Sequence, residues 1–512
     1  MDTWKGQCAS KKEEGQTMKA AKTMGREYVR QVPPLQVFSE AQLEEIHYAS
    51  LEVLRRTGVH VQLPEAVDLL SKAGCHVDGA RVYIPPGLVE WAIRSAPSQV
   101  VLCDRDGNEA IRVEGYKPYY GTGSDCIFVL DPYSGERRPA RLDDVAAFAK
   151  LVDALSNMDF AMGMSVANDV PGEIADILQF YAMVSNTVKP MVYAVNDPRS
   201  LRVIVEMCEA IAGGADAFRR KPFALLFGCS ISPLLYSAGP TESLLYTAEK
   251  GLPYILAPTA SAGGTGPVTL PGALVQINAE MLAGLVMAQV KREGTPFIMF
   301  GGCPTPLDMK TTIASYASPE FLLFQIGLTQ LQHYQGLPIF GTAGCSDSKV
   351  FDQQATLEGA MSMLVSSLSG ANLIHDVGYV EYGSTSCFEQ VVTMNELAGE
   401  IRFLLRGMDV GRETMALDVI DSVGPGGEYV TSDHTLNHFR EGWFPEIIGD
   451  RHVHDAWVDK GRKTLGDRAN EKVRHILENH VPKPLAEATR AKLEALIDEA
   501  RKSAGVGEDP AQ

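Results

Sequence analysis

Eight short β-rich runs, each followed by a helix-like segment, constrain the fold of this chain more than any other feature. The runs begin near Tyr119, and each ends in a stretch of small or polar residues. They read KPYYGTG, DFAMGMSVAND, PMVYAVND, PFALLFGCS, PYILAPTA, PFIMFGGC, PIFGTAG and NLIHDVGY. Near-continuous apolar strands that alternate with helices indicate a parallel sheet covered on both faces.

Eight such units predict an α/β fold in which residues 116–410 form a (β/α)8 TIM barrel. An open doubly wound sheet is the alternative, but no GxGxxG loop follows the first run. We expect residues 1–35 to form a flexible N-terminal lead and residues 36–115 to form a small N-terminal α/β subdomain. Residues 411–512 are expected to form a C-terminal helical extension that packs on the barrel or on a second subunit.

The N-terminal subdomain is predicted from one clear helix and two short strands. The helix begins after Ser39, which suits an N-cap, and ends at Gly58. Strand-like residues follow around Val59 and Val82.

Composition excludes several classes of protein. The net charge of −18 argues against non-specific nucleic-acid binding, which needs a basic surface. It suits a cationic substrate, although many acidic proteins are simply soluble. The nine cysteines form no CxxC pair and are odd in number, which indicates reduced thiols in a cytoplasmic protein.

No targeting or membrane segment is expected. The first residues carry charges throughout and lack the apolar core of a secretory signal. The longest apolar stretch, GALVQINAEMLAGLVMAQV, contains Gln276, Asn278 and Glu280. It is therefore predicted to be a buried helix and not a membrane span.

The stretch GTAGCSDSK, residues 341–349, combines glycines with a cluster of polar side chains at the end of the seventh run. Active sites of these barrels lie at the C-terminal ends of the strands, so we expect this stretch to line the mouth. Its glycines allow close approach of the backbone. Asp347 either faces the site or, like Ser348, caps the next helix. Lys349 either joins the site or is a solvated lysine of the first helical turn.

The same argument selects polar and aromatic residues at the other strand ends. They are Tyr119, Tyr120, Asp125, Asn168, Asp169, Asn196, Ser230, Cys303, His375, Asp376 and Glu381.

The residues alone leave the reaction open. No GxSxG nucleophile elbow follows a strand, and no HExxH metal motif is present. Cys303, Cys345 and His375 could meet at one mouth to bind zinc, although no local motif supports this. A Schiff-base enzyme would use a lysine near a strand end, and Lys349 lies past its strand. The pattern indicates a barrel enzyme with an aromatic, carboxylate-lined mouth.

Five stretches together resemble the trimethylamine methyltransferase family. They are YGTGSD, LDPYSGERRPARLDDVAAFAKLVDALSNMDF, GTAGCSDSKVFDQQA, ANLIHDVGYVEYG and GPGGEYVTSDHTLNHFREGWFP. The resemblance extends from about residue 35 to residue 480. It implies a large barrel protein that transfers a methyl group from a methylamine to a corrinoid protein.

One departure shapes what the resemblance implies. Founding members of the family carry pyrrolysine in the barrel, whereas every position here is a standard residue. The chain therefore resembles the pyrrolysine-free branch, whose members look like methyltransferases of quaternary amines such as glycine betaine. The nucleophile would be Co(I) of a separate corrinoid protein, so this chain needs no metal and no tightly bound cofactor of its own.

A quaternary ammonium lacks N–H groups, so aromatic faces and carboxylates would recognise it. We expect Asp347, His375 and Glu381 to act in catalysis. The predicted substrate-binding residues are Tyr119, Tyr120, Asp125, Asn168, Tyr193, Phe300, Lys349 and Tyr379. His375, Asn168, Lys349 or backbone N–H groups would hold the carboxylate of a betaine. We also expect a homo-oligomer. A zinc- or lysine-dependent lyase or hydrolase and a non-catalytic quaternary-amine binder are the alternatives.

Overall fold

Seven parallel strands and one short eighth segment form a closed barrel in the computed structural model, which describes residues 30–195, 197–301 and 305–506. The seven strands pair in the order β6, β18, β17, β14, β12, β10, β9. Their bounds are β6 Tyr119–Tyr120, β9 Met191–Ala194, β10 Ala224–Ser230, β12 Tyr254–Pro258, β14 Phe297–Phe300, β17 Ile339–Thr342 and β18 Leu373–His375.

The second predicted run closes the circle between β6 and β9. Two isolated parallel bridges link it to the neighbouring strands, Gly121 to Phe160 and Ala161 to Met191. The N–H of Phe160 donates to the Tyr120 carbonyl, and the N–H of Val192 donates to the Ala161 carbonyl. The barrel predicted from the eight runs is therefore confirmed, with one position that is much shorter than the rest.

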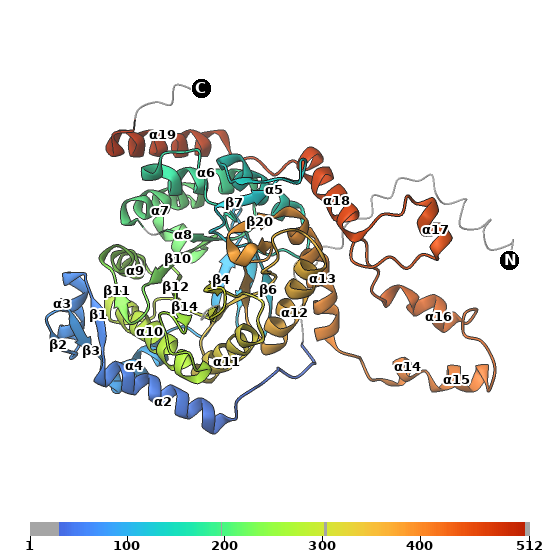
Figure 1. Cartoon of the computed structure of the whole chain (residues 1–512), viewed down its shortest axis with the longest axis horizontal. Coiled ribbons are helices and arrows are strands. Elements are labelled where there is room, and N and C mark those ends of the chain that lie inside the picture. The colour runs from blue at the N-terminus through green and yellow to red at the C-terminus, as the bar shows by residue number, and fades with distance from the viewer. Residues whose placement is uncertain (1–29, 196, 302–304, 507–512) are drawn as a thin grey trace.

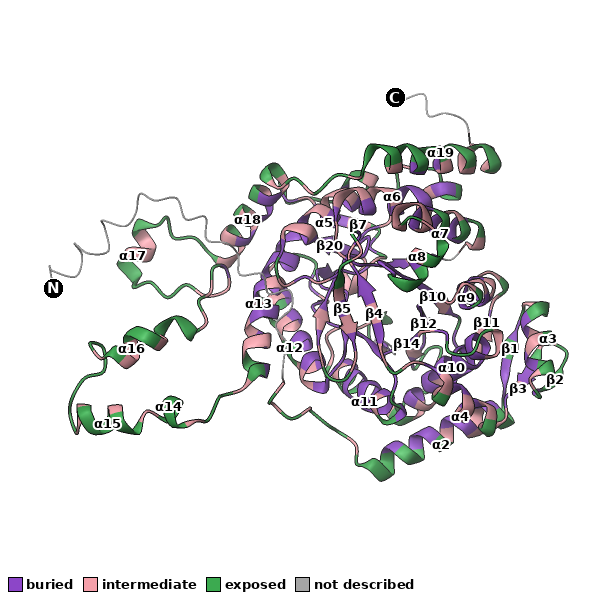
Figure 2. Ribbon diagram, turned by 180° about the vertical axis from the view of Figure 1, so that it is seen from behind, coloured by how far each residue is buried: buried purple, intermediate pink, exposed green. Residues whose placement is uncertain are grey.

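A helix follows each of the eight strand positions and covers the outside of the barrel (Figure 1). The eight are α5 Leu142–Ala154, α6 Ala175–Asn186, α7 Pro198–Ala212, α9 Ala238–Lys250, α10 Leu270–Lys291, α11 Pro319–Gln335, α12 Gln353–Ser369 and α13 Phe388–Arg406. α8, Ala215–Arg220, is an extra turn before β10. The strands are buried on both faces, which explains their nearly continuous apolar sequence (Figure 2).

The described N-terminal residues contain short strands and helices that precede the barrel. α2, Glu40–Arg56, begins at an N-cap formed by Ser39, whose side chain accepts from the N–H of Gln42. The chain turns at Gly58 with a positive φ of 69°. The remaining elements are β1 Val59–Val61, α3 Pro64–Lys72, β2 His76–Asp78, β3 Arg81–Tyr83 and α4 Pro86–Ser95. The predicted lead over residues 1–35 lies largely outside the described residues.

A hairpin closes the end of the barrel at which the strands begin. Its strands are β4, Val100–Cys103, and β5, Glu109–Val113. The N–H of Cys103 donates to the Pro222 carbonyl, directly before β10, and the N–H of Arg105 donates to the Val188 carbonyl, before β9. Figure 2 shows the hairpin from this side. Access from solvent is therefore left to the opposite end, where the strands finish.

Short strands from the βα loops surround that opposite end, which we call the open end. β7 Phe128–Leu130, β8 Arg137–Pro139, β19 Tyr379–Val380 and β20 Thr385–Cys387 form one sheet. β13 Ser261–Ala262, β15 Thr305–Asp308 and β16 Ile313–Ala314 form another. β11, Leu235–Tyr236, instead joins β1.

The long apolar helix α10 is part of the barrel wall. By length and composition it could cross a membrane, yet 83% of its most apolar window is buried inside the molecule. It packs against α2 and α4 on one side and against β12 and β14 on the other. The expectation that this stretch is a buried helix is therefore confirmed.

The C-terminal residues are helical, as expected. α18, Leu465–Asn479, packs on α13 and α5, and α19, Glu487–Ala504, packs on α7 and α6. Between α13 and α18 the chain makes a long excursion away from the body (Figure 1). It contains α14 Arg412–Met415, α15 Leu417–Val423, α16 Asp433–His438, η3 Phe439–Glu441 and α17 His454–Asp459.

Candidate active site

Aromatic side chains from opposite strands meet inside the barrel and form a floor below its open end. Phe227 of β10 and Phe340 of β17 have ring centroids 5.8 Å apart although two strands separate them in the sheet. Phe300 of β14 lies 5.8 Å from Phe340, and Phe160 lies 6.4 Å from it. These contacts are possible only if the rings point inward.

His375, the last residue of β18, stands on this floor. Its ring centroid lies 4.1 Å from that of Phe340 and 5.7 Å from that of Phe300. Its Nδ1 is 2.7 Å from the Gly341 carbonyl, so Nδ1–H donates and Nε2 is left as an acceptor. Burial lowers the pKa of His375 to about 3, against a smaller opposing effect of the Gly341 hydrogen bond. The imidazole is therefore neutral at physiological pH.

Two carboxyl groups lie above the floor. Asp376 follows His375 directly, and its Oδ1 is 3.3 Å from His375 Nε2. Burial, followed by repulsion from Asp125, raises the pKa of Asp376 well above its ordinary value. Solvent reaches Asp125, yet protein atoms surround it on most sides, and this desolvation raises its pKa as well. Like charges that share a site ionise together only with difficulty, so the empty site favours one protonated carboxyl.

Tyr379 holds the two carboxyl-bearing loops together. Its hydroxyl accepts the N–H of Ser124 at 2.6 Å and the N–H of Asp125 at 2.9 Å. It also hydrogen-bonds to Asp376, which lowers the pKa of that carboxyl in part. Asp376 has a positive φ of 68°, a sparsely populated conformation for a residue with a side chain. Such strain is found at sites where geometry serves function.

The glycines of the YYGTGSD stretch make room for rings. A Cβ on Gly121 would lie 2.2 Å from the Phe160 ring, and a Cβ on Gly123 would lie 2.2 Å from the Tyr379 ring. Both glycines have ordinary φ values, so space and not backbone conformation requires them. The first strand end is thus shaped around the floor and around Tyr379.

The loop after β17 reaches the open end, as predicted from GTAGCSDSK, but Asp347 does not cap the next helix. Asp352 is the N-cap of α12, and its side chain accepts from the N–H of Ala355. Asp347 instead accepts from the Ser315 hydroxyl at 2.5 Å and from the Tyr316 N–H at 3.0 Å. It therefore joins the loop after β17 to the loop after β14.

Ser348 and Lys349 also turn to local partners. The Ser348 hydroxyl donates to Asp352, so it supports the N-cap without forming it. Lys349 is exposed, and its Nζ donates to the Asp347 carbonyl at 2.8 Å. The Lys349 ammonium lies 5.9 Å from the centroid of the Tyr382 ring.

Glu381 is engaged by a cation of this chain. Arg137 donates to both of its carboxylate oxygens, at 2.7 and 3.2 Å, and Thr385 adds a short hydrogen bond. The Arg137 guanidinium also stacks on the Phe128 ring. Glu381 thus joins β8 to β20, and its carboxylate is engaged by Arg137 and Thr385.

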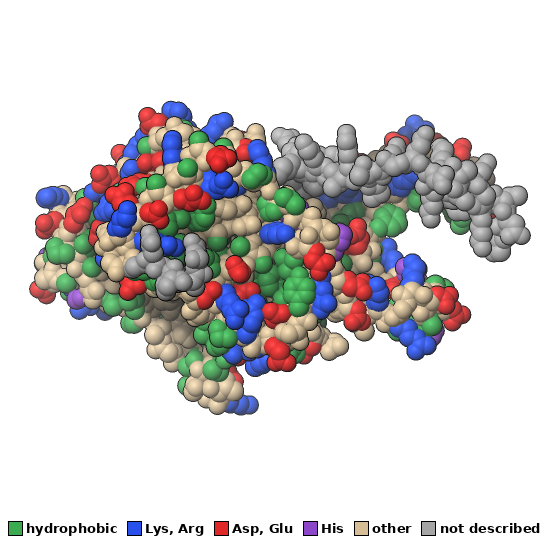
Figure 3. Space-filling model, turned by 90° about the horizontal axis from the view of Figure 1, so that it is seen from above, with side chains coloured by type: hydrophobic (Ala, Val, Ile, Leu, Met, Phe, Trp, Pro, Cys, Tyr) green, Lys and Arg blue, Asp and Glu red, His purple; other side chains and the backbone are tan. Residues whose placement is uncertain are grey.

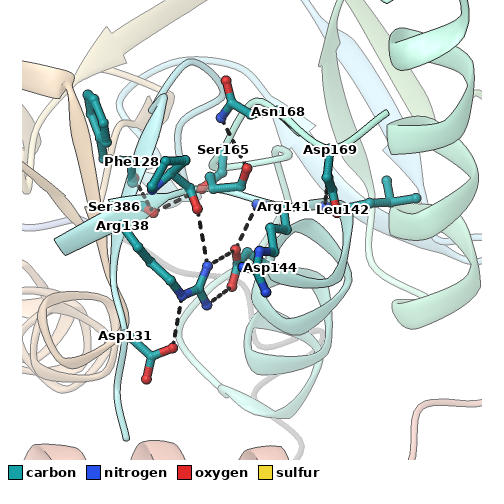
Figure 4. Close-up of polar contacts among 12 residues, drawn as sticks. Phe128, Asp131, Arg138, Arg141, Leu142, Asp144, Ser165, Asn168, Asp169 and Ser386 are labelled. Carbon is teal, nitrogen blue, oxygen red and sulfur yellow. Dashed lines mark hydrogen bonds and ion pairs between the residues drawn. The ribbon is translucent and has the colours of Figure 1, made fainter. Parts of the chain in front are cut away.

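Asn168 and Asp169 join the end of the second strand position to the segment that leads into α5 (Figure 4). The Asn168 amide donates to the carbonyls of Ile127, Ala140 and Val166, each at 3.0 Å. Asp169 accepts from the N–H of Leu142 at the start of α5. Their functional groups are therefore used inside the fold.

A second group of contacts in this region fixes the β7–β8 hairpin. Arg138 donates to Asp144 at 2.7 and 2.8 Å and to Asp131 at 3.0 Å (Figure 4). These two carboxylates, with Asp144 first, raise the pKa of Arg138. The ion pairs attach the hairpin to α5 at the edge of the open end.

Three of the predicted tyrosines lie away from the open end. The Tyr119 hydroxyl accepts from the N–H of Arg112 in the hairpin at the closed end. Tyr120 bonds to the Ser367 hydroxyl of α12, and Tyr193 donates to the Asp176 carbonyl in α6. Since Tyr120 and Tyr193 point into the helix layer, their rings are not available to a ligand in the barrel. We do not include the three in the proposed site.

Sequence reasoning missed part of the floor. Phe227, Phe340 and the partly exposed Cys229 were not selected, although each lies on the inward side of a strand. Alternation along the strands relates them: Phe227 shares a face with Cys229 two residues later, and Phe340 shares one with Thr342 at the end of β17. Asn196 and Cys303 lie outside the described residues. Within the described ranges, no three His, Cys, Asp or Glu side chains gather as a metal site would require.

A closed (β/α)8 barrel with desolvated carboxyl groups, one of them on a strained residue, at the C-terminal ends of its strands defines the class: an enzyme barrel with its candidate site at the open end. The family is given by sequence. The profile of the trimethylamine methyltransferase (MTTB) family matches residues 5–506, and the chain belongs to this family of methyltransferases.

Individual relatives carry two different substrate names. The trimethylamine methyltransferase MttB of Desulfitobacterium hafniense (strain DSM 10664 / DCB-2) is 34% identical, covering 92% of this chain and 95% of the relative. The glycine betaine methyltransferase of D. hafniense (strain Y51) is 31% identical, covering 93% of this chain and 99% of the relative. The crystal structure of the Methanosarcina barkeri monomethylamine methyltransferase aligns with a TM-score of 0.48 and 11% identity, covering 93% of this chain and 89% of that one.

Proposed function

We propose that this protein transfers a methyl group from a quaternary amine to the Co(I) of a separate corrinoid protein. The observation that carries the proposal is the pair Asp125 and Asp376 above an aromatic floor at the open end of the barrel. A permanent cation would bind between two carboxylates and above ring faces, because both attract positive charge.

The chemistry fits a site without a general acid. The C–N bond breaks toward nitrogen, so the leaving group is a neutral tertiary amine that needs no proton. Reduced cobalt in the corrinoid protein supplies the electron pair for the new bond to the methyl carbon. This chain would hold the cation, direct one methyl outward and exclude water.

Each of the predicted catalytic residues has a role in this proposal. His375, neutral and fixed by Gly341, orients Asp376 and forms part of the floor. Asp347 keeps two loops of the open end together. Glu381 fixes the β8–β20 edge through Arg137. Of the predicted substrate-binding residues, we propose that Asp125, Phe300 and Tyr379 form the cation site, and we add Asp376, Phe227 and Phe340.

Some quaternary amines, such as glycine betaine, also carry a carboxylate. Whether the site accepts them depends on which hydrogen-bond donors are free to bind that carboxylate. The three side chains predicted to hold a betaine carboxylate already bond to the protein: His375 to Gly341, Asn168 to three carbonyls and Lys349 to Asp347. A betaine carboxylate would therefore rely on backbone N–H groups or on a protonated Asp376. Quaternary amines that lack a carboxylate make no such demand.

We also propose the setting in which the enzyme works. The corrinoid protein would dock over the open end, since the hairpin β4–β5 closes the other end. We propose a homo-oligomer located in the cytoplasm, with no tightly bound cofactor and no contact with nucleic acid or membrane. The net charge of −18 supports the exclusion of nucleic acid, and Figure 3 shows acidic and basic side chains interspersed over the body.

A corrinoid assay tests the function. The purified protein is mixed with a reduced corrinoid protein and one amine at a time: glycine betaine, choline, tetramethylammonium and trimethylamine. We expect methylation of cobalt, seen in the visible spectrum, with at least one quaternary amine and no demethylation without the corrinoid protein. Turnover without it would contradict the proposal. Amine binding with no methylation of any corrinoid protein would instead support a binding protein.

A further inference from the structure

The outer face of α12 is unusual for a barrel helix. Leu357, Met361 and Leu364 follow each other at spacings of four and three residues and are 64%, 50% and 36% exposed. We call these three residues the α12 face. The side of α12 that packs on the barrel is instead built from small residues, including Ala355, Gly359, Ser362 and Ser366. Three large apolar side chains therefore point outward, where a solvent-facing helix carries polar residues, although Met363 is buried on the inner side.

The α12 face also lacks charge. Glu358 is the only charged residue between Gln353 and Ser369, and its carboxylate accepts from the Ser346 hydroxyl and the Asp347 N–H at the open end. The outer face of α7 shows the ordinary pattern, with exposed Arg199, Arg202 and Glu206.

A second unpartnered surface follows α13, the helix that packs against α12. The chain leaves α13 after Arg406 and returns at Trp443, and we call residues 407–442 the arm. Within the arm, α14, α15 and α16 have no buried residue. Its exposed apolar side chains are Met408, Val410, Met415, Leu417, Ile420, Tyr429, Val430, Leu436 and Phe439. Figures 1 and 2 show the arm standing away from the barrel with most of its surface exposed.

Both ends of the arm are fixed on α13. A Cβ on Gly399 would lie 2.4 Å from the Trp443 ring, which packs there and against Phe403. Glu396 accepts backbone N–H groups at positions 446 to 448. The arm is thus a held loop, not a loose tail. Short helices without a core of their own are not stable in water, so the arm needs a surface to pack on.

We propose that the arm of one copy packs on the α12 face of a second copy, and the reverse, in a two-fold dimer. The arm starts at the C-terminal end of α13, which packs directly against α12. A two-fold axis near this point exchanges both surfaces at once and leaves neither uncovered. The arm alone is longer than the roughly 20–30 residues that each partner gives to a standard interface.

A second copy fits better than the corrinoid protein as the occupant. The corrinoid protein has to reach the open end, whereas the α12 face is on the flank of the barrel. The arm carries the acidic residues Asp409, Glu413, Asp418 and Asp421, and an uncharged partner surface avoids repelling them. The inference does not depend on the identity of the amine or on catalysis.

Sedimentation of the full-length protein tests the dimer. We expect a dimer, or a larger assembly built from it, at micromolar concentration. Leu357→Glu with Met361→Glu should give monomers, and so should Leu417→Glu with Ile420→Glu. Val481→Glu, at an apolar position 83% exposed between α18 and α19, is the matched control and should keep the wild-type mass. Should the glutamate variants fail to fold, Leu357→Ala with Met361→Ala should still raise the dissociation constant at least about tenfold.

Mixing the two classes of variant distinguishes a reciprocal exchange from other contacts. A face variant has an intact arm, and an arm variant has an intact face, so the mixture should form mixed dimers through one of the two contacts. A monomeric wild-type protein, wild-type mass in both variants, or a mixture that stays monomeric would overturn the proposal. Wild-type mass together with a loss of methyl transfer in the face variant would overturn it in favour of corrinoid-protein docking.

Discussion

The open end of the barrel and the arm depart from the usual distribution of side chains in opposite directions. At the open end, Asp376 is buried in a conformation that costs free energy. On the arm, apolar side chains such as Met408 and Val430 are 85% and 79% exposed. Both arrangements are unfavourable in the isolated chain. In our two proposals each becomes favourable with a complementary ligand, a small cation in the first case and an apolar protein surface in the second.

The largest expected effect is a loss of methyl transfer that leaves the assembly unchanged, which would separate the role of the open end from that of the arm. Asp125→Asn with Asp376→Asn removes both charges while keeping the shape of the site. We expect kcat/KM for methyl transfer to fall at least about 100-fold, equal to about 2.7 kcal/mol, while the sedimentation of the assembly stays unchanged. Asp216→Asn on the exposed helix α8 is the control and should match wild type. Near-normal kinetics in the double variant would remove the cation site from the open end.

A smaller effect is expected from one methyl group. Gly123→Ala places a Cβ 2.2 Å from the Tyr379 ring, which has to move and which holds the N–H groups of Ser124 and Asp125. Overpacking of this kind costs about 1–3 kcal/mol, and we expect kcat/KM to fall about tenfold. Gly87→Ala in α4, where a Cβ meets open space, is the control. Unchanged activity and unfolding midpoint would mean that Tyr379 does not set the site geometry.

The paired carboxyls predict how amine binding depends on pH. Desolvation raises the pKa of Asp125 and of Asp376, so below the raised pKa values a binding cation would expel a proton from the site. Affinity should therefore rise with pH through the raised pKa, by up to about tenfold per pH unit for one proton. Calorimetry in two buffers with different ionisation enthalpies measures the released proton. An affinity independent of pH would contradict the prediction.

The same raised pKa values give the opposite trend for stability. Between pH 3.8 and the raised pKa, the folded protein binds more protons than the unfolded chain. This contribution to the free energy of unfolding is present at low pH and is lost as pH rises through the raised pKa. The aspartate-to-asparagine double variant should lack it. Urea unfolding of both proteins at several pH values compares the two, and equal slopes would place the carboxyls in water.

The smallest effect is expected at Asp347. Asp347→Asn keeps one acceptor oxygen for Ser315 or the Tyr316 N–H but loses the charge. Hydrogen bonds to charged groups exceed neutral ones by about 1 kcal/mol, so kcat/KM should fall about two- to fivefold. A loss above about 100-fold would instead place Asp347 in contact with the substrate.

The barrel was predictable because its signal is repeated. Buried strands leave apolar runs, and the helices between them leave polar faces, so eight copies of one pattern support each other. The second run was counted correctly, yet its pairing with β6 and β9 is reduced to isolated bridges at Phe160 and Ala161. Capping of α12 by Asp347 or Ser348 was one of the open alternatives, but Asp352 is the N-cap; several residues of the loop can cap a helix, and only packing selects one.

The sequence indicated which residues lie at the strand ends, where we propose the site, but it did not indicate which way their side chains point. Strand ends gave Asp125, His375 and Asp376, because the topology brings them to one end. Tyr120 and Tyr193 also lie on barrel strands, but their side chains point into the helix layer. Along a strand, a shift of one residue moves a side chain to the opposite face of the sheet. Which carboxyls find internal partners could not be read from sequence either, as Glu381 shows with Arg137, more than two hundred positions away.

The two bridges that complete the barrel have a consequence for its motions. A closed ring of strands opens first at its weakest link, and here the link between β6 and β9 carries far fewer ladder hydrogen bonds than the pairing of β10 with β12. Amide protons such as those of Phe160 and Val192 should therefore exchange with solvent through small local openings, sooner than those of β10 and β12. The seam runs under the loop that carries Asp125. The same part of the ring that is least firmly closed thus lies beneath the residue that we expect to meet the substrate.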